Sequence, residues 1–538
     1  MLKVQCRFVG LLVEPIRGVF SWRCLGIQAL CLGLLLSGSL FAQEPAAPAN
    51  GDAAAPPAAA VKYQTIPVHP ALAGNTAQAR QVRNRVAGEV RGMLRGDLKL
   101  DEEANKAKFD GWYTQYLFAS MTQPENLATL DITRQKFLRQ DLGFAKDQTV
   151  HDYLVKDLTL PQMTAIVRGN FHPAVRYNAM LIISNLNIVE VPTSGQRQPP
   201  KPLLDSLVVI TEELQNEKQS DAVKLAAWVG LLRHVQLNLI NPQIPPTAVQ
   251  IIRTTATKLL AQKEPPAGRS LRGHVWMQRR AIEVLTAVET PGAPGDVISQ
   301  IEAMAADGQA PLALRLTAAR SLGSLPYGAG TKATPGGSAT HLGALAAVIC
   351  RTEMSRVEDE KKALEQEVNA AAGGDLDEMM MDDMDMEGDD GGGLAEMFDQ
   401  ENTGGGDVGS NLSDQQREDL NYTKRMLKYR LYYVLVGLGS EKDNTGLFKV
   451  AADPANKAQV RKISGMVTGI LEELEPAEPE AGQPLIELDR DQLLQKLRKQ
   501  VRQLESATTV ESAAGGANAA GDDDDLPGVG VRRQGKQG

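Results

Sequence analysis

Apolar residues recur every three or four positions through most of the chain, and this spacing is typical of amphipathic helices. The segment from Asp101 to Met121 shows it clearly, with large side chains that share one predicted helix face: Phe109, Trp112, Tyr113, Tyr116 and Leu117. Runs in which apolar and polar residues alternate are not sustained, so we expect almost no sheet. The pattern predicts an all-α fold.

Most of this patterning lies in residues 78–350. Within them we expect helices over Pro124–Leu142, Thr149–Leu158 and Pro161–Arg168, separated by Gly and Pro. The chain is much longer than an ordinary domain of ~100 to 200 residues, so it holds either several domains or one repeat array. The low aromatic content of 4% and the abundance of good helix formers favour an array of helices.

A short motif occurs four times between residues 175 and 325. Each copy has an apolar residue, a long polar residue, two further positions, and an Ala followed by spaced apolar residues. The copies are Val175-Arg176 with Ala179, Val223-Lys224 with Ala227, Met277-Gln278 with Ala281, and Leu314-Arg315 with Ala318. A small side chain at a fixed place lets a neighbouring helix approach closely, so the motif predicts that helices stack on one another.

The stretch from Phe171 to Arg176, with Ala179 and Leu186, resembles the start of the second helix of a HEAT repeat. Ser220–Lys224 is similar to it, and the likeness covers roughly residues 150–330. The resemblance implies a HEAT-like α-solenoid of stacked helical hairpins, of a secreted bacterial type. Each unit of such an array buries its apolar face on its neighbours, and the extended surface usually binds proteins.

Two shorter seams of apolar residues follow the repeats. Residues 351–372 predict a charged helix with a short coiled-coil seam, and residues 411–506 predict further helices. The first seam consists of Met354, Val357, Lys361, Leu364 and Val368, and the second of Leu494, Leu497, Val501 and Leu504. Two heptads are marginal alone, so the seams either pack back on the solenoid or pair with another chain.

The net charge of -9 is unevenly distributed. Residues 375–401 hold twelve acids and no Lys or Arg, so the helical body is roughly neutral. We expect residues 373–410 to form a disordered acidic insert rich in Met and Gly, and residues 507–538 to form a disordered tail. No dense basic face with interleaved aromatic residues is present in the sequence, which excludes nucleic acid as an expected partner.

Residues 1–42 read as a signal peptide with a basic start and an apolar run of the right length. Cleavage is expected after Ala42, and an uncleaved signal anchor is the alternative and the one expected link to a membrane. Residues 43–77 then form a disordered Ala/Pro-rich tether. The chain is therefore expected to be exported, either periplasmic or secreted. Cys350 is the one cysteine after the leader, and its apolar surroundings predict a buried, inert thiol.

The acidic insert also carries the one candidate metal site. Thioethers suit Cu(I) and carboxylates suit harder cations, and both gather at Met381, Met384 and Met386 with Asp382, Asp383 and Asp385. The alternatives are a solvated acidic linker and an acidic linear motif that docks on a basic groove. No cofactor is expected.

Catalytic patterns are not apparent in the sequence. The histidines do not form a zinc motif, and no arrangement of Ser, His and Asp predicts an activated nucleophile. We expect His172 to cap a helix at a turn and His151 to cap or decorate a helix start. The leading hypothesis is an exported, non-catalytic scaffold or adaptor that binds an unidentified protein partner through a helical-repeat surface. The alternative is an envelope protein that binds or buffers metal through its Met/Asp-rich insert.

Overall fold

The computed structural model describes residues 62–191, 198–288, 295–325, 327, 334–378, 414–474 and 490–514. The chain divides into two units, Met1–Lys62 and Tyr63–Gly538, and the fold below is that of the second. Its described residues are predominantly helical, which confirms the all-α prediction. The described strands are β1 (Asn187–Val189) and β2 (Lys201–Pro202), which form one small antiparallel pair.

The N-terminal helices enclose a core of aromatic rings. Tyr113 lies with its ring centroid 4.9 Å from that of Phe109 and 6.0 Å from that of Phe137, and all three side chains are buried. The elements here are α2 (Ala77–Arg95), α3 (Glu103–Trp112), η1 (Tyr113–Leu117), α4 (Phe118–Met121), η2 (Pro124–Thr129), α5 (Leu130–Lys136), η3 (Phe137–Leu142), α6 (Gln148–Asp152) and η4 (Tyr153–Thr159). η1 and η4 are π-helical turns inside longer helices, and η3 is a π-helical turn at the end of the helix that begins with α5.

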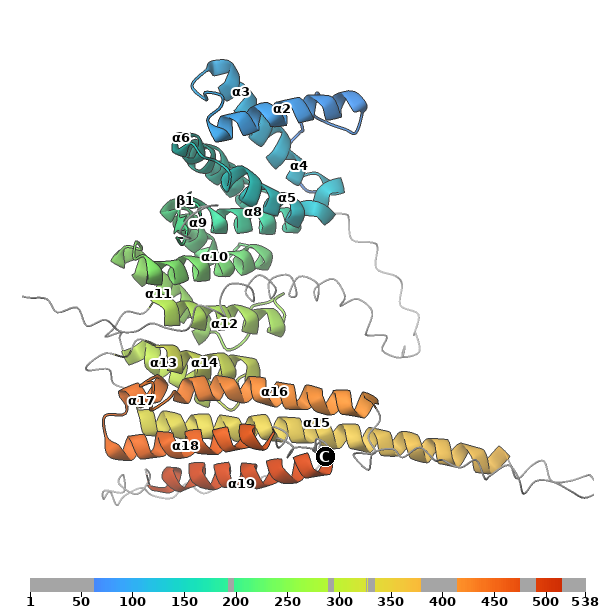
Figure 1. Cartoon of the computed structure of the whole chain (residues 1–538), viewed down its shortest axis with the longest axis vertical. Coiled ribbons are helices and arrows are strands. Elements are labelled where there is room, and N and C mark those ends of the chain that lie inside the picture. The colour runs from blue at the N-terminus through green and yellow to red at the C-terminus, as the bar shows by residue number, and fades with distance from the viewer. Residues whose placement is uncertain are drawn as a thin grey trace, which may run out of the picture. The chain divides into compact units, whose positions relative to one another are not determined.

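Two rows of helices follow, and Figure 1 shows them succeeding one another in chain order. The first row is α7 (Leu160–Arg168), α9 (Leu204–Gln215), α11 (Pro246–Ala261), α13 (Gly295–Ala306) and α15 (Pro335–Glu378). The second row is α8 (Pro173–Asn185), α10 (Asp221–Ile240), α12 (Leu271–Val288), α14 (Leu312–Ser324) and α16 (Asp414–Leu438). Each first-row helix packs on the next helix of the second row, and second-row helices pack on their neighbours in order.

The four motif copies lie in four second-row helices: they begin at the third residue of α8, α10 and α14 and at the seventh residue of α12. Their alanines are all buried, as the close approach of neighbouring helices requires: Ala179, Ala227, Ala281 and Ala318. In three copies the long polar residue donates to a carbonyl at the end of the preceding first-row helix: Arg176 to Val167, Gln278 to Gln262, and Arg315 to Ala305. In these three pairs the motif therefore fixes one helix against the other, because it satisfies helix-end carbonyls that would otherwise lack partners.

α14 and α16 approach so closely that glycine is required at their crossing. A Cβ atom on Gly323 would lie 1.7 Å from the Val436 carbonyl oxygen, and one on Gly437 would lie 2.3 Å from the Ala319 carbonyl oxygen. The two backbones touch at this point.

The remaining described helices close the C-terminal end: α17 (Gly446–Val450), α18 (Pro454–Glu473) and α19 (Arg490–Ala514). α19 runs antiparallel to α15, as three ion pairs show: Arg351 with Glu505 at 2.9 Å, Glu358 with Arg498 at 2.7 Å, and Lys361 with Asp491 at 2.9 Å. The second predicted seam is buried in this region. Among the described residues, the seams thus pack within one chain.

Several predicted boundaries are wrong. Residues 62–76 belong to the fold: the Gln64 amide donates to the Asn170 carbonyl at 2.7 Å, the Ile66 amide to the Thr122 hydroxyl at 2.8 Å, and Leu72 is buried. This segment contains large apolar side chains, which the Ala/Pro-rich stretch before it lacks. Helices propagate more easily than they start, and this accounts for the continuations beyond the predicted ends. α15 crosses the predicted boundary at residue 350 and enters the predicted insert as far as Glu378. α19 likewise enters the predicted tail as far as Ala514. The helix from Gln148 to Arg168 is continuous where a break was predicted between Leu158 and Pro161.

Candidate protein-binding surface

α16 presents a row of tyrosines to solvent. Leu427, Leu431 and Val434 bury one face of this helix. Tyr422, Tyr429 and Tyr432 are on the other side, with exposed fractions of 46%, 54% and 59%, and Arg425 is exposed in the same stripe. The three- and four-residue steps between these positions place them together along the helix.

Arginines from two neighbouring helices reach the tyrosines. The Arg320 guanidinium of α14 lies 5.4 Å from the ring centroid of Tyr433, and the Tyr433 hydroxyl is 2.7 Å from the Tyr429 hydroxyl. Burial and the hydrogen bond with Tyr433 raise the pKa of Tyr429 to about 12, against the lowering influence of Arg279 and Arg320. The influence of Arg279 on Tyr429 indicates that α12, α14 and α16 bring these groups close together.

Arg356 of α15 extends the same arrangement. Its guanidinium lies 4.7 Å from the Tyr422 ring centroid and donates to the Thr423 hydroxyl. Glu353, a buried carboxylate, accepts from Arg430 and so holds α15 and α16 in register beneath the rings. We call Arg279, Arg320, Arg356, Tyr422, Arg425, Tyr429, Tyr432 and Tyr433 the tyrosine–arginine surface.

Among the described residues, no carboxylate neutralises Arg279, Arg320 or Arg425, whereas Arg356 is paired with Glu353 at 3.6 Å and with Glu360 at 3.4 Å. Arg279 donates to the Thr317 hydroxyl at 2.9 Å, but neither it nor Arg320 nor Arg425 forms an ion pair within the described ranges. Several other arginines are paired, among them Arg168, Arg269 and Arg498, each within 3 Å of a carboxylate oxygen. Tyr and Arg are the residue types enriched in protein interfaces and in their energetic centres.

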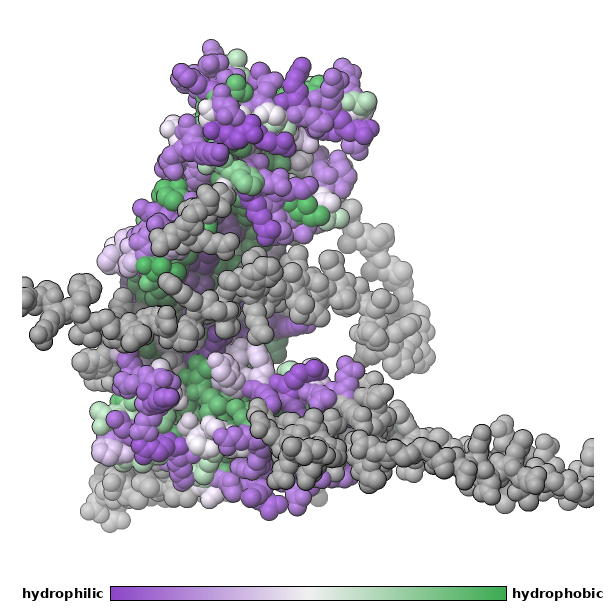
Figure 2. Space-filling view, in the orientation of Figure 1, coloured by the Kyte–Doolittle hydropathy of each residue, from purple (hydrophilic) through white to green (hydrophobic). Residues whose placement is uncertain are grey.

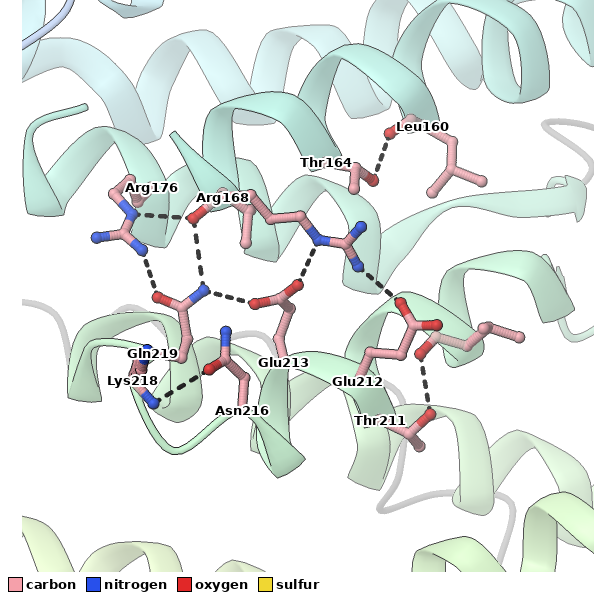
Figure 3. Close-up of polar contacts among 12 residues, drawn as sticks. Leu160, Thr164, Arg168, Arg176, Thr211, Glu212, Glu213, Asn216, Lys218 and Gln219 are labelled. Atoms are coloured by element: carbon pink, nitrogen blue, oxygen red, sulfur yellow. Dashed lines mark hydrogen bonds and ion pairs between the residues drawn. The ribbon is translucent and has the colours of Figure 1, made fainter. Parts of the chain in front are cut away.

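A second polar cluster is interior and joins three elements (Figure 3). Arg168 Nε donates to Glu213 at 2.6 Å, and Gln219 Nε2 donates to the same carboxylate at 2.6 Å. Arg176 donates to Gln219 and, at 2.9 Å, to the Val167 carbonyl. Glu213 is only 2% exposed, so this cluster positions α7, α8 and α9 and offers little to a ligand.

The surface in the view of Figure 2 is mostly hydrophilic around α2 and α3, while hydrophobic residues gather in separate patches farther along the unit. Exposed apolar side chains include Val208 of α9 and Leu239 and Ile240 at the end of α10.

The histidines have structural positions. His172 Nδ1 accepts from the Ala174 amide at 3.2 Å, which confirms the predicted cap. The prediction for His151 is wrong, because Asp147 caps α6 and His151 is buried inside the helix. Its ring nitrogens are 3.7 Å from Asp152 and 3.8 Å from Glu190, and neither has a hydrogen-bond partner.

His234 and Ser206 are 3.2 Å apart and resemble a base and a nucleophile. Both are fully buried, and the Ser206 hydroxyl donates to the Leu203 carbonyl at 2.6 Å. Burial, with some repulsion from Arg233, lowers the pKa of His234 to about 3, so the ring stays neutral. A substrate could not reach this pair without local unfolding.

Cys350 is buried as predicted, and burial raises the pKa of its thiol to about 12, which leaves it unreactive. The candidate metal residues Met381, Met384, Met386, Asp382, Asp383 and Asp385 lie outside the described residues, as does the predicted signal peptide. In the ranges that are described, no cluster of three or more His, Cys, Asp or Glu side chains is placed to hold a metal ion. None of the described helices is both long and apolar enough to span a bilayer.

Comparisons with models of protein families, with curated proteins and with solved structures found no match. The tyrosine–arginine surface was not predicted from the sequence. Its one visible signal is the density of tyrosines in residues 422–433, since the arginines that reach them come from helices far away in the chain.

Proposed function

We propose that the chain is an exported, non-catalytic scaffold or adaptor, and that its two helical rows form a HEAT-like α-solenoid that binds another protein through the tyrosine–arginine surface. Export rests on the signal-like residues 1–42.

The solenoid is supported by the order of packing. Each second-row helix contacts its neighbours in the row, and the motif residues Arg176, Gln278 and Arg315 make the same type of contact in three of the four motif copies. Equivalent contacts at successive positions are what a stack of similar helix pairs produces. In such a stack, the face of one row is a continuous surface made from many helices.

The observation that carries the binding role is the exposure of tyrosines beside unpaired arginines. Solvent-exposed rings at 54% and 59% on Tyr429 and Tyr432 contribute little to folding. A rigid ring that packs against a partner contributes much to affinity, since few rotamers are lost on binding. The rings lie on one helix, α16, and arginines from α12, α14 and α15 surround them, which supports a rigid docking platform.

Affinity capture from the native envelope fraction tests the proposal. The unaltered chain is compared with Tyr429→Ala/Tyr432→Ala and with Phe144→Ala, which removes a ring of similar exposure (55%) far from the surface in sequence. Captured proteins are identified by mass spectrometry, and the main one is purified and titrated by calorimetry. We expect the double variant to lose at least tenfold in affinity and Phe144→Ala to bind as the unaltered chain does.

A variant lacking residues 379–410 separates this surface from the acidic insert. Retention of the same purified partner by the shortened chain is the expected result. Loss of binding on that deletion, with the tyrosine variant unaffected, would move the binding role to the insert and contradict the proposal.

A further inference from the structure

We propose that the partner presents an acidic stretch of polypeptide to the tyrosine–arginine surface, with its Asp or Glu carboxylates bound by Arg279, Arg320 and Arg425. This inference rests on the proposed function and names the chemical class of its partner.

Carboxylate is the group these arginines lack. Arg320 and Arg425 are exposed and Arg279 is half-buried, and none of the three has an acidic partner among the described residues. A guanidinium presents donors in a planar fork that matches a carboxylate, and charge-assisted hydrogen bonds of this kind are stronger than neutral ones. Because the rings of Tyr429 and Tyr433 lie beside Arg320, part of its solvation is already removed before a partner arrives.

The tyrosine hydroxyls complete the acceptor site. Tyr429 and Tyr433 share one hydrogen bond at 2.7 Å, in which one hydroxyl donates and the other accepts. The accepting hydroxyl keeps its own proton, and this proton is left for an oxygen of the partner. A carboxylate near Tyr429 would therefore meet guanidinium and phenol donors together.

The shape of the surface favours an extended peptide over a small anion. Tyr422 and Tyr432 are ten residues apart on α16, which corresponds to about 15 Å along a helix. An extended chain covers that length with about five residues, at ~3.3 Å each. Exposed rings at both ends leave room for aliphatic side chains between the acidic ones, and nucleic acid would need a denser basic face.

A second molecule is the better occupant because the chain leaves the rings uncovered. Arg356 lies over the Tyr422 ring, yet Tyr422, Tyr429 and Tyr432 keep exposed fractions of 46% to 59%, so the described segments leave about half of each side chain uncovered. The acids of residues 375–401 are the competing occupant, and the test includes them.

Fluorescence anisotropy with a defined probe tests the inference. The probe is a fluorescein-labelled peptide of 12 residues in which Glu and Leu alternate, and its twin has Gln in place of Glu. Each is titrated with the purified chain at 50 mM and 300 mM NaCl. We expect the Glu peptide to bind at least tenfold more tightly than the Gln peptide, and to weaken at the higher salt concentration because exposed charges are screened.

Two variants locate the binding. Arg279→Gln/Arg320→Gln should weaken the Glu peptide at least tenfold, while Arg461→Gln, which removes an exposed arginine of α18, should change its affinity less than twofold. Thermal unfolding of each variant checks that it is folded. Equal binding of the Glu and Gln peptides, or an unchanged affinity in the double variant, overturns the inference.

Further arms exclude other ligands. A labelled dT20 strand or inorganic phosphate that binds more tightly than the Glu peptide overturns the assignment to an acidic polypeptide. The last arm uses a chain that lacks residues 379–410. If it binds the Glu peptide more than tenfold more tightly than the unaltered chain does, the chain's own acids are the occupant, and the proposal of a second molecule is overturned. If the captured envelope partner depends on Tyr429 and Tyr432 while the Glu peptide fails to bind, the proposed function stands and this inference alone falls.

Discussion

Around Tyr113, the N-terminal helices pack aromatic rings against one another and enclose the Asp141 carboxyl group, whereas at the crossing of α14 and α16 backbone packs on backbone. Burial raises the pKa of Asp141 to about 7, despite the lowering influence of Tyr113 and Arg91. Gly323 and Gly437 leave no room for a side chain. The N-terminal helices accommodate a carboxyl group in an unfavourable environment, whereas the crossing of α14 and α16 has no room for an added atom. The two ends of one helical unit should therefore fail under different stresses, one under pH and the other under added volume.

The largest expected effect is at the glycine crossing. Gly323→Ala places a Cβ 1.7 Å from the Val436 carbonyl oxygen, so the helices must separate. We expect a loss of about 3 kcal/mol in the free energy of unfolding, since overpacking outweighs the gain in helix propensity. Urea unfolding followed by circular dichroism measures it. Gly469→Ala in α18 is the control, because nothing lies within 4 Å of its Cβ and the variant should gain about 0.5 to 1 kcal/mol.

Asp141→Asn tests the other end. The folded-state pKa near 7 lies above the ordinary value of 3.8, so the folded chain holds a proton that the unfolded chain releases. Stability from this group therefore falls as the pH rises from about 4 to about 7. The variant should gain about 2 to 3 kcal/mol in the free energy of unfolding at pH 8 and nothing at pH 4.

Asp152→Asn is the matched control for Asp141. Burial raises the pKa of Asp152 slightly, but hydrogen bonds from Lys156 and Gln148 outweigh it and hold the pKa below its usual value. This variant should lose stability at pH 8, the opposite sign to Asp141→Asn. The free energy of unfolding of both variants is measured at pH 4 and pH 8 and compared with that of the unaltered chain. If Asp141→Asn changes it equally at both pH values, the burial of Asp141 is contradicted.

The polar cluster of Figure 3 lies between the N-terminal aromatic core and the crossing of α14 and α16, and its disruption should change the free energy of unfolding by an intermediate amount. Arg168→Gln leaves the buried Glu213 carboxylate with one strong donor, Gln219. We expect a loss of about 1 to 3 kcal/mol, the range for a buried polar group that loses a partner. Hydrogen exchange should show weaker protection in α7 and α9 and little change in α16, because stacked helices pass perturbations chiefly to their neighbours. A uniform loss of protection across the unit would argue against the expectation that a perturbation reaches chiefly the neighbouring helices.

The smallest effect is expected for the ion pairs between α15 and α19. Arg498 and Glu358 are 2.7 Å apart, and their side chains are 52% and 36% exposed. Arg498→Gln should therefore lower the free energy of unfolding by only about 0.2 to 1 kcal/mol, less still at high salt. Leu497→Ala in the same helix removes a buried side chain and should exceed it several times over. A comparable loss from both variants, measured by urea unfolding, would mean that charge pairing dominates this contact.

Sequence patterning predicted the buried faces of individual helices well. Ala179, Ala227, Ala281 and Ala318 are all buried, and Val501 and Leu504 of the second seam lie in the core. These features depend on periodicity within one helix, which the sequence displays directly. The same reasoning identified His172 as a cap, because a polar residue before Pro at a turn is a local signal.

Contacts between distant helices were beyond that reasoning. The charges of Arg279 and Arg320 act on Tyr429 although about 150 residues of chain separate Arg279 from Tyr429, and no local sequence pattern predicts that α12, α14 and α16 lie near one another. The contact of Gly323 with Val436 is likewise invisible in the sequence. The π-helical turns were missed because they insert one residue into a helix without altering its apolar face enough to be recognised.

The antiparallel pairing of α15 with α19 also sets the order in which the molecule can be completed. Arg351 and Glu505 lie 2.9 Å apart, yet Glu505 is synthesised long after Arg351. At ~5 to 20 residues per second, the roughly 150 residues between them take on the order of 10 s to emerge from a ribosome. During that interval the side of α15 that α19 will cover has no partner, whereas α8 to α12 already have theirs. The C-terminal end is thus the last part of a newborn chain to resist proteases, and the first place where a chaperone would find an apolar helix face to hold.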